Sequence, residues 1–358
     1  MSFVDAIIDP SSDRIHVVER TEDGERKFVD YPAEYVFYYD DPAGKHQTIY
    51  RTPVTRVASN SNRMFRKEVQ LQKSAGKKLW EHDCNPVFRC LETYYMDKPA
   101  PTLHTCFFDI EVDFDASKGG YAPISDPFNK ITAITVYLDW IPQLVTLSVP
   151  PPTMTFEEAV AIADTFENTF VFETEEEMID MFLNLIDDAD VLSGWNSEGY
   201  DIPYTIGRIT RILSKDDLRR LCLWGQLPKA RESSSHGSKF TTYDLVGRVH
   251  LDYMLLYQKY TYEERHSYAL NSIGEYELGQ TKVEYEGSLD QLYRQDFSKF
   301  LEYNRQDVML LANLDKKLKF LDLSNALAHD IPVLLQTTMG PVAVTDQAIL
   351  NAAHTSNL

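Results

Sequence analysis

The stretch FFDIEVDFD, residues 107–115, places a carboxylate at every second position: Asp109, Glu111, Asp113 and Asp115. In a β-strand, side chains two residues apart point to the same face and lie about 7 Å from each other. Two such carboxylates can hold a pair of divalent ions that sit about 4 Å apart. The stretch therefore predicts a strand with one apolar face and one acidic face whose repulsion bound cations would offset.

Two further motifs place acids beside other polar groups. In GWNSEGYDIPY, Asp201 follows a glycine-rich turn just before a helix is predicted to begin. In YNRQDV, Tyr303 and Asp307 are spaced i, i+4, so their hydroxyl and carboxylate share one face of a predicted helix. Hard oxygen ligands of this kind suit Mg²⁺ or Mn²⁺. Together the motifs predict a metal-binding acidic site.

Each motif also has an ordinary structural interpretation when taken alone. An Asp-x-Glu pair on a strand is commonly a solvated face, and an aspartate before Ile-Pro is commonly a helix cap. A tyrosine and an aspartate spaced i, i+4 commonly form a surface pair. The occurrence of all three in this order, each on a suitable element, favours the catalytic interpretation.

The elements around these motifs follow a mixed α/β pattern. TCFFDIEVDF, KITAITVYLDW and DVLSGWN are predicted strands, and IPYTIGRITRIL is a predicted helix with proline near its first turn. A helix is also predicted over ETEEEMIDMFLNLIDD, where Thr174 and Glu177 form a capping box. Two more helices are expected around residues 267–276 and 296–319. Strands and helices that alternate in this way indicate an α/β domain.

Residues 1–98 are predicted to form a β-rich α+β domain. RIHVVERTEDGERKFVDY is two alternating runs around Glu-Asp-Gly, which predicts a hairpin, and YVFYYDDPAGKHQTIYR repeats the pattern with a Pro-Ala-Gly turn. KPAPT, residues 98–102, has the prolines of a linker. The tail, residues 323–358, is predicted to be mostly helical and is too short for a domain of its own.

The formal net charge of −20 argues against broad, nonspecific binding of nucleic acid. The charge is uneven, however, because residues 51–78 contain eight Lys or Arg and a single acid, Glu68. Such a strip is either a local nucleic-acid surface or an ordinary solvated face. Four cysteines without a CxxC pair indicate reduced thiols in a cytoplasm. No apolar run is long enough to span a bilayer, so no membrane contact is expected.

FFDIEV, GWNSEGYDIPYTIGRI and YNRQDV resemble the three exonuclease motifs of family B DNA polymerases. The likeness is greatest to the replicative polymerases of T-even type bacteriophages, and LDYMLLYQKY shares in it. The resemblance implies a ribonuclease H-like exonuclease domain over residues 99–322. It also implies an N-terminal domain over residues 1–98, to which residues 323–358 return.

The resemblance further implies a metal-dependent 3′→5′ exonuclease that proofreads DNA in the cytoplasm of an infected bacterial host. Its substrate would be the 3′-terminal phosphodiester of single-stranded or frayed DNA, hydrolysed by a two-metal mechanism. Asp109 would bridge two Mg²⁺ or Mn²⁺ ions, Glu111 and Asp307 would complete the site that generates the hydroxide, and Asp201 would hold the second ion through water. Tyr303 would orient the attacking water.

Substrate contacts follow from the same resemblance. Tyr121, in GGYAP, matches a position where the family places an aromatic ring near the terminal base, with core packing as the alternative. Asn196 is expected to position its turn or to contact the terminal nucleotide. The hairpin tip at residues 233–239 matches a loop that helps to separate primer from template, with a disordered polar loop as the alternative. Asp113 and Asp115 have no identifiable distant partner and are expected in solvent, at the end of the strand or in the following loop.

Segments resembling the polymerase motifs SLYPS and DTDS do not occur, so nucleotide incorporation is not expected from this chain alone. The resemblance covers the front third to half of the family's usual length and implies a separate or missing polymerase domain as partner. One alternative is a nucleic-acid-binding or scaffolding subunit that binds RNA through residues 51–78 or docks a polymerase chain. Another alternative is a nuclease acting on RNA. The acids alone do not exclude it, because they contact phosphate and metal and do not contact the 2′-hydroxyl.

Overall fold

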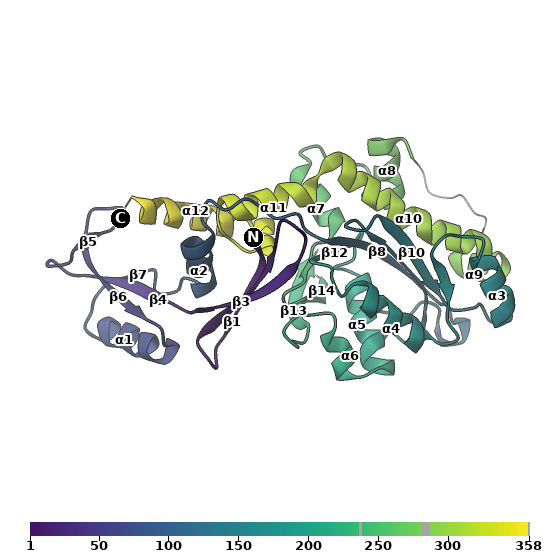
Figure 1. The fold of residues 1–358 in the computed structure, drawn as a ribbon, viewed down its shortest axis with the longest axis horizontal. Coiled ribbons are helices and arrows are strands. Elements are labelled where there is room, and N and C mark those ends of the chain that lie inside the picture. Colours follow the sequence, from purple (N-terminus) through teal and green to yellow (C-terminus); the bar gives the residue numbers. More distant parts are fainter. Residues whose placement is uncertain (236–237, 281–286, 357–358) are drawn as a thin grey trace. The chain divides into compact units, whose positions relative to one another are not determined.

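The computed structural model describes residues 1–235, 238–280 and 287–356 (Figure 1). The chain divides into two compact units, one made of Met1–Thr102 with Asp322–Leu358 and the other of Leu103–Leu321. Strands and helices are mixed in both units, which confirms the predicted mixed α/β class. Within the described residues, no helix is long and apolar enough to cross a membrane.

A six-stranded sheet forms the centre of the second unit, in the order β11–β10–β9–β8–β12–β15. β8 is an interior strand, antiparallel to β9 on one side and parallel to β12 on the other. Interior strands covered on both faces need apolar residues, as Phe107, Phe108 and Ile110 provide. The strands are β8 (Thr105–Val112), β9 (Ile131–Leu138), β10 (Gln143–Ser148), β11 (Thr169–Val171), β12 (Val191–Ser193) and β15 (Val249–His250).

Helices cover both faces of this sheet. Successive side chains of β8 point to opposite faces, and their contacts show which helix covers each face. Phe108 packs against Phe182 of α4 with ring centroids 6.1 Å apart, so this residue belongs to the core as its apolar type indicates. Asp109, on the opposite face, is bonded to Asn304 of α10. The helices of the unit are α3 (Phe156–Ala163), α4 (Glu175–Leu185), α5 (Asp201–Ile212), α6 (Lys215–Arg219), α7 (Tyr253–Tyr260), α8 (Leu270–Leu278), α9 (Leu289–Gln295) and α10 (Phe297–Leu318).

Caps and a buried ion pair fix where these helices begin. The hydroxyl of Thr174 accepts the backbone N–H of Glu177 at 3.2 Å, so α4 begins at the predicted N-cap. The guanidinium of Arg208 donates to both carboxylate oxygens of Glu175 and to the carbonyl of Pro127. This buried pair joins α5 to the first residue of α4, and removing one partner would cost about 3–5 kcal/mol.

The first unit contains two antiparallel sheets, and only one of its two predicted hairpins is correct. β2 (Arg14–Arg20) pairs with β3 (Arg26–Pro32) as predicted. β4 (Tyr35–Asp40) does not pair with β5 (His46–Gln47); both pair with β6 (Pro53–Ser59). The turn approaches β6 closely at Gly44, where a Cβ would stand 2.3 Å from the carbonyl oxygen of Val54. The turn therefore packs against β6 instead of folding β5 back onto β4.

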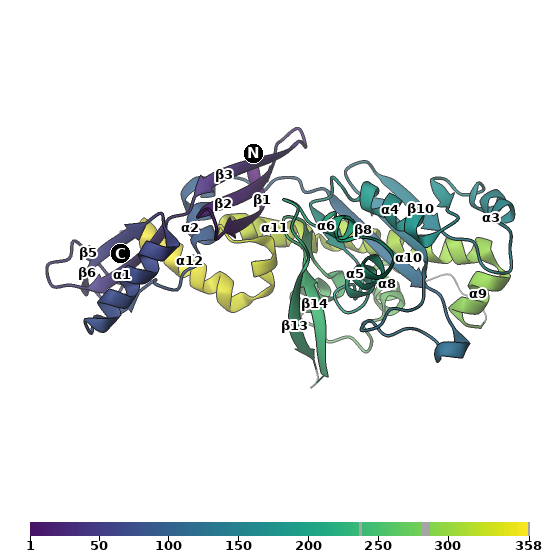
Figure 2. The same cartoon turned by 90° about the horizontal axis from the view of Figure 1, so that it is seen from below.

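The tail of the chain packs with the N-terminal strand in the same unit (Figure 2). His329 of α11 stacks on Phe3 at 4.2 Å between ring centroids, and its Nε2 is 3.0 Å from the Phe3 carbonyl. Asn325 donates to the carbonyl of Pro101 at 2.8 Å. The remaining elements are β1 (Ser2–Asp9), β7 (Leu79–Trp80), α1 (Asn62–Ser74), α2 (Pro86–Tyr95), α11 (Phe320–Asp330) and α12 (Pro341–Thr355).

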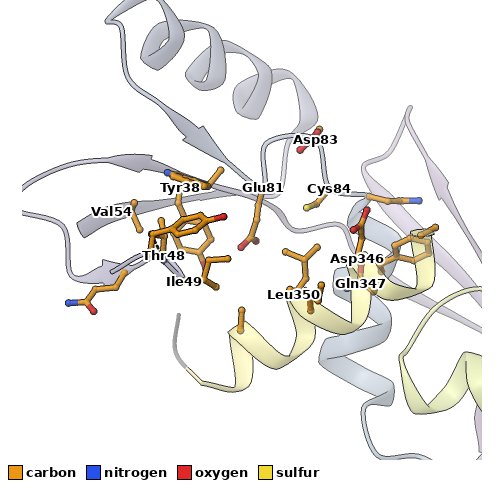
Figure 3. A pocket seen from close by; sticks show the side chains of 18 residues that line it. Tyr38, Thr48, Ile49, Val54, Glu81, Asp83, Cys84, Asp346, Gln347 and Leu350 are labelled. Carbon is orange, nitrogen blue, oxygen red and sulfur yellow. Dashed lines mark hydrogen bonds between the residues drawn. The ribbon is translucent and has the colours of Figure 1, made fainter. Parts of the chain in front are cut away.

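A hollow of about 620 Å³ opens in this first unit between the sheet of β4 and the helix α12 (Figure 3). Tyr38, Trp80 and Leu350 give it an apolar wall. Glu81 also lines the hollow, but its carboxylate is already paired with Arg89 at 2.7 Å and with His354 of α12 at 3.1 Å. None of the acids of the predicted catalytic motifs is among its lining residues.

Candidate active site

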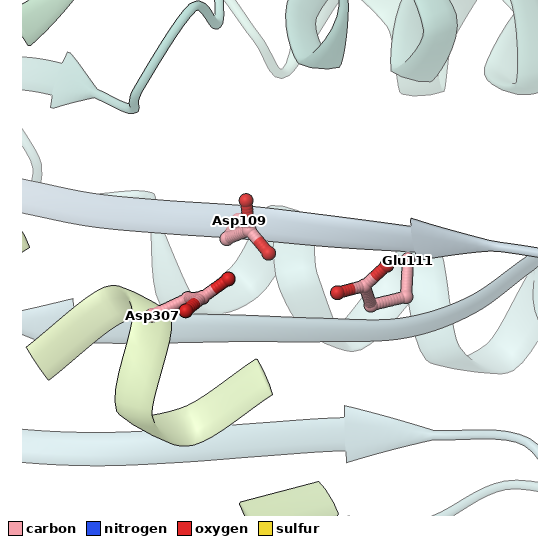
Figure 4. A group of neighbouring side chains, drawn as sticks. All are labelled: Asp109, Glu111 and Asp307. Atoms are coloured by element: carbon pink, nitrogen blue, oxygen red, sulfur yellow. The ribbon is translucent and has the colours of Figure 1, made fainter. Parts of the chain in front are cut away.

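Three of the predicted catalytic acids converge in the second unit. Asp109 and Glu111 project from one face of β8, Asp307 projects from α10, and their carboxylates turn toward one another (Figure 4). One oxygen of each lies within 4.8 Å of the other two. Glu111 is 8% exposed and Asp307 is 4% exposed. Because like charges this close disfavour ionisation in a buried setting, the group is suited to hold a hard cation.

Asp201 lies beside this group, with its carboxylate turned to the backbone. It is the first residue of α5, and its Oδ1 accepts the N–H of Ile110, the residue between the two acids of β8, at 3.2 Å. Burial raises the pKa of the Asp201 carboxyl, and the charge of Asp252 adds to this, whereas the bond from Ile110 lowers it. Asp201 is not part of the three-carboxylate group, and its predicted role as a metal ligand stays a prediction.

The turn before Asp201 depends on small residues and on Asn196. A Cβ on Gly194 would lie 2.7 Å from the Cβ of Ser197, so a larger residue does not fit there. Asn196 takes a positive φ of 61°, and its carbonyl accepts the N–H groups of Gly199 and Tyr200 at 3.1 Å each. Its side chain is exposed. Asn196 therefore shapes the turn, and its contact with a nucleotide stays a prediction.

Two aromatic rings stand near the acids, and only one of them was expected. Tyr121 is 48% exposed and meets Phe114 edge to face at 5.1 Å. Tyr200, which the sequence analysis overlooked, stacks on Tyr204 at 5.3 Å. Burial raises the pKa of the Tyr200 hydroxyl, and the charges of nearby acids, Glu111 among them, add to this effect. Its place directly before the acid of the second motif was the available signal.

Tyr303 lies one helical turn before Asp307 on α10. Its ring is half-buried and packs against a hydrophobic cluster that includes Phe300 and Leu301. The i, i+4 spacing on a continuous helix puts both residues on one face, as predicted. Its role in orienting water stays a prediction.

The second half of the acidic run has different partners. β8 ends at Val112, so Asp113 and Asp115 lie beyond the strand, as expected. Asp115 accepts from the backbone N–H of the residue two positions on and pairs with Lys118 at 3.4 Å. Asp113 accepts from Arg294 of α9 at 2.7 Å. The expectation that Asp113 has no distant partner was wrong, because tertiary folding brings in a residue 181 positions away.

The predicted hairpin consists of β13 (Lys229–Ser235) and β14 (Ser238–Asp244). Its turn, residues 236–237, lies outside the described residues, and so does the centre of the predicted strand-separating loop. Arg231 of β13 pairs with Glu198 at 3.3 Å. This contact connects the hairpin to the turn that carries the acid of the second motif.

The six-stranded mixed sheet with helices on both faces is consistent with the predicted ribonuclease H-like fold. Residues 59–273 match the family described as DNA polymerase family B, exonuclease domain. The chain belongs to this family. The matched range contains Asp109, Glu111 and Asp201 and ends before Tyr303 and Asp307. Only the three-dimensional structure brings Asp307 together with Asp109 and Glu111.

Several viral polymerases are similar to the chain. The DNA-directed DNA polymerase of Escherichia phage RB69 is 26% identical over 95% of this chain and 39% of its own length. That of Enterobacteria phage T4 is 28% identical over 51% of this chain and 20% of its own length. The DNA polymerase of Orgyia pseudotsugata multicapsid polyhedrosis virus is 28% identical over 46% of this chain and 17% of its own length. The chain thus spans well under half the length of these relatives.

Proposed function

We propose that this chain is a metal-dependent 3′→5′ exonuclease that serves as the proofreading part of a phage-type family B replicative DNA polymerase. The observation that carries the proposal is the approach of Asp109, Glu111 and Asp307 to within 4.8 Å in a chain whose residues 59–273 match the family B exonuclease domain. Its substrate is the 3′-terminal phosphodiester of single-stranded or frayed DNA. Its partner is a polymerase domain, and its setting is the cytoplasm of an infected bacterial host.

The donor set fits two divalent ions, Mg²⁺ or Mn²⁺. Asp109, Glu111 and Asp307 offer only carboxylate oxygens, which hard cations prefer, and Asp201 is bonded to the backbone N–H of Ile110, the residue between the first two. When bound, such ions neutralise charge on the phosphodiester and lower the pKa of water. The carboxylates of the chain hold the ions and set their positions relative to the terminal phosphate.

The other predicted residues act on water and on the substrate. Tyr303 orients the water, because a phenol with a pKa near about 10 is a poor base at neutral pH. Tyr121 stacks on the terminal base, and its 48% exposure leaves the ring surface available for this. Asn196, with its exposed side chain, contacts the terminal nucleotide.

A nucleic-acid-binding or scaffolding role for the first unit has less support. The relatives that are similar to the chain are DNA polymerases. The basic residues at 51–78 lie partly on α1, which has no buried residue and therefore fits an ordinary solvated helix equally well.

The test is degradation of labelled single-stranded DNA in Mg²⁺ by Asp109→Ala. We expect the rate to fall at least about 10³-fold, since the variant would lack one carboxylate that would hold the cations, whose charge would stabilise the transition state. The matched control is Asp115→Ala, which should degrade DNA at close to the wild-type rate. A matched RNA oligonucleotide measures the preference for DNA. Wild-type rates in Asp109→Ala would refute the assignment.

A further inference from the structure

A row of polar side chains crosses the sheet from Asp109. In the strand register, Thr135 of β9 lies opposite Asp109, Thr146 of β10 lies opposite Thr135, and Thr169 of β11 lies opposite Thr146. Residues directly opposite one another share a face of the sheet. At the far end, Arg305 of α10 donates to Thr146 at 3.1 Å and to Thr169 at 2.9 Å. The row therefore lies on the face that α10 covers.

Asn304 of α10 connects this row to Asp109, the predicted catalytic acid. Its Nδ2 donates to Oδ2 of Asp109 at 2.8 Å, and its Oδ1 is bonded to the hydroxyl of Thr135. The hydroxyls of Thr135 and Thr146 are 3.0 Å apart. Asn304 and both threonines are fully buried, so water does not compete for these bonds.

Elementary donor and acceptor rules fix the direction of every hydrogen bond in this row of polar side chains. A carboxylate only accepts, so Asn304 must turn its NH₂ to Asp109 and its oxygen to Thr135. The single hydroxyl proton of Thr135 then goes to Asn304, and Thr135 must accept from Thr146. Thr146 in turn accepts from Arg305, which only donates. All protons therefore point from the cation Arg305 toward the anion Asp109.

We propose that Asn304 is a positioning residue for Asp109, and that the chain Arg305–Thr146–Thr135 holds the Asn304 amide in its one useful orientation. The bond to Oδ2 restricts rotation of the Asp109 carboxylate, which prepares it to receive a cation. Bonds aligned in one direction polarise and strengthen one another. The inference rests on the proposed metal-dependent function, and it assigns part of the metal affinity to residues that touch no metal.

The test measures Mn²⁺ affinity directly, by titration calorimetry or by the EPR signal of free Mn²⁺, on the full chain. Asn304→Leu should weaken binding about 10- to 100-fold, as loss of a partner behind a metal ligand commonly does. Thr135→Val keeps the shape but removes the hydroxyl, and should weaken binding about 3- to 10-fold.

Two variants separate a hydrogen-bonding role from simple packing. Thr135→Ser keeps the hydroxyl but removes a buried methyl group, so it should bind Mn²⁺ as the wild type does while melting at a lower temperature. Thr205→Val removes a buried hydroxyl that has no hydrogen-bond partner among the described residues, and should leave the affinity unchanged. Weaker binding in Thr135→Ser with unchanged binding in Thr135→Val would overturn the inference.

Asp109→Ala in the same titration separates the two proposals. If it binds Mn²⁺ as the wild type does, the metal site is misplaced and the proposed function fails. If Asp109→Ala loses affinity while Asn304→Leu and Thr135→Val bind like the wild type, only the positioning role fails. Should Asn304→Leu not fold, as judged by circular dichroism, the isosteric Thr135→Val decides.

Discussion

The two halves of residues 107–115 each carry two carboxylates, but the surroundings of the two pairs are opposite. Asp109 and Glu111 lie within β8 and meet a third carboxylate within 4.8 Å. Asp113 and Asp115 lie beyond the strand, where Arg294 and Lys118 pair with them at 2.7 and 3.4 Å. In the second half the protein supplies the cations itself. A run of acids does not by itself predict a metal site; the approach of a further acid, Asp307, to part of the run does.

The largest loss of activity is expected from a substitution of Asp307, the acid that lies close to Asp109 and Glu111. Asp307→Asn keeps the size of the side chain but removes one of the three charges, so exonuclease activity should fall at least about 10³-fold. Because it also removes repulsion, the variant without metal should melt no lower than the wild type. The measurements are single-stranded DNA degradation and thermal denaturation in EDTA. A lower melting temperature in EDTA would contradict the repulsion between the three carboxylates.

An intermediate loss of activity is expected from a substitution of Asp201, because this residue lies beside the three-carboxylate group without belonging to it. Asp201→Asn should lower exonuclease activity about 10²-fold, less than loss of a direct ligand. The amide oxygen can still accept the N–H of Ile110, so the free energy of unfolding should change by only about 1 kcal/mol. Both quantities can be measured by DNA degradation and urea denaturation. Wild-type activity would remove Asp201 from the set of metal ligands.

A third set of acids, in the first unit, is neutralised by a cation that titrates. Hydrogen bonds to Glu81 and Glu92 raise the pKa of His354 to about 9. Because the folded pKa lies above the unfolded value of about 6.5, the stabilisation is complete below that pH and is lost as pH rises toward 9. Urea denaturation should show a loss of about 3 kcal/mol over this window, independent of metal.

The control for that measurement is His46→Gln, which replaces an exposed histidine of β5 and should retain the pH dependence. His354→Gln should abolish it. Equal pH dependence in both variants would show that another group is responsible.

The smallest effects belong to the second half of the acidic run. Asp113→Asn loses a partly buried ion pair with Arg294 and should cost about 1 kcal/mol, with activity within about threefold of the wild type. Asp115→Ala should leave both the free energy of unfolding and the activity close to those of the wild type. Urea denaturation and DNA degradation measure both. Inactivation by Asp115→Ala as complete as by Asp109→Ala would erase the distinction between the two halves.

Local patterns predicted the elements that carry the site. Alternation around Asp109 predicted β8, the Thr174 cap predicted the start of α4, and helical spacing placed Tyr303 and Asp307 on one helix. The same reasoning failed for the pairing of β4, because a turn sequence does not reveal which strand its backbone will meet. It also gave no sign of the Asp113–Arg294 pair.

The sequence by itself determined which acids were available, which elements would present them and which face of each element they would occupy. These properties depend on neighbours within a few positions, where strand and helix periodicity act. Only the tertiary structure decided that Asp307 joins Asp109 and Glu111, that Asp201 turns to the backbone of Ile110, and that a row of threonines ends at Asn304. These are contacts between residues far apart in the chain, and they arise because packing a helix onto a sheet selects, among many polar groups, those that end face to face.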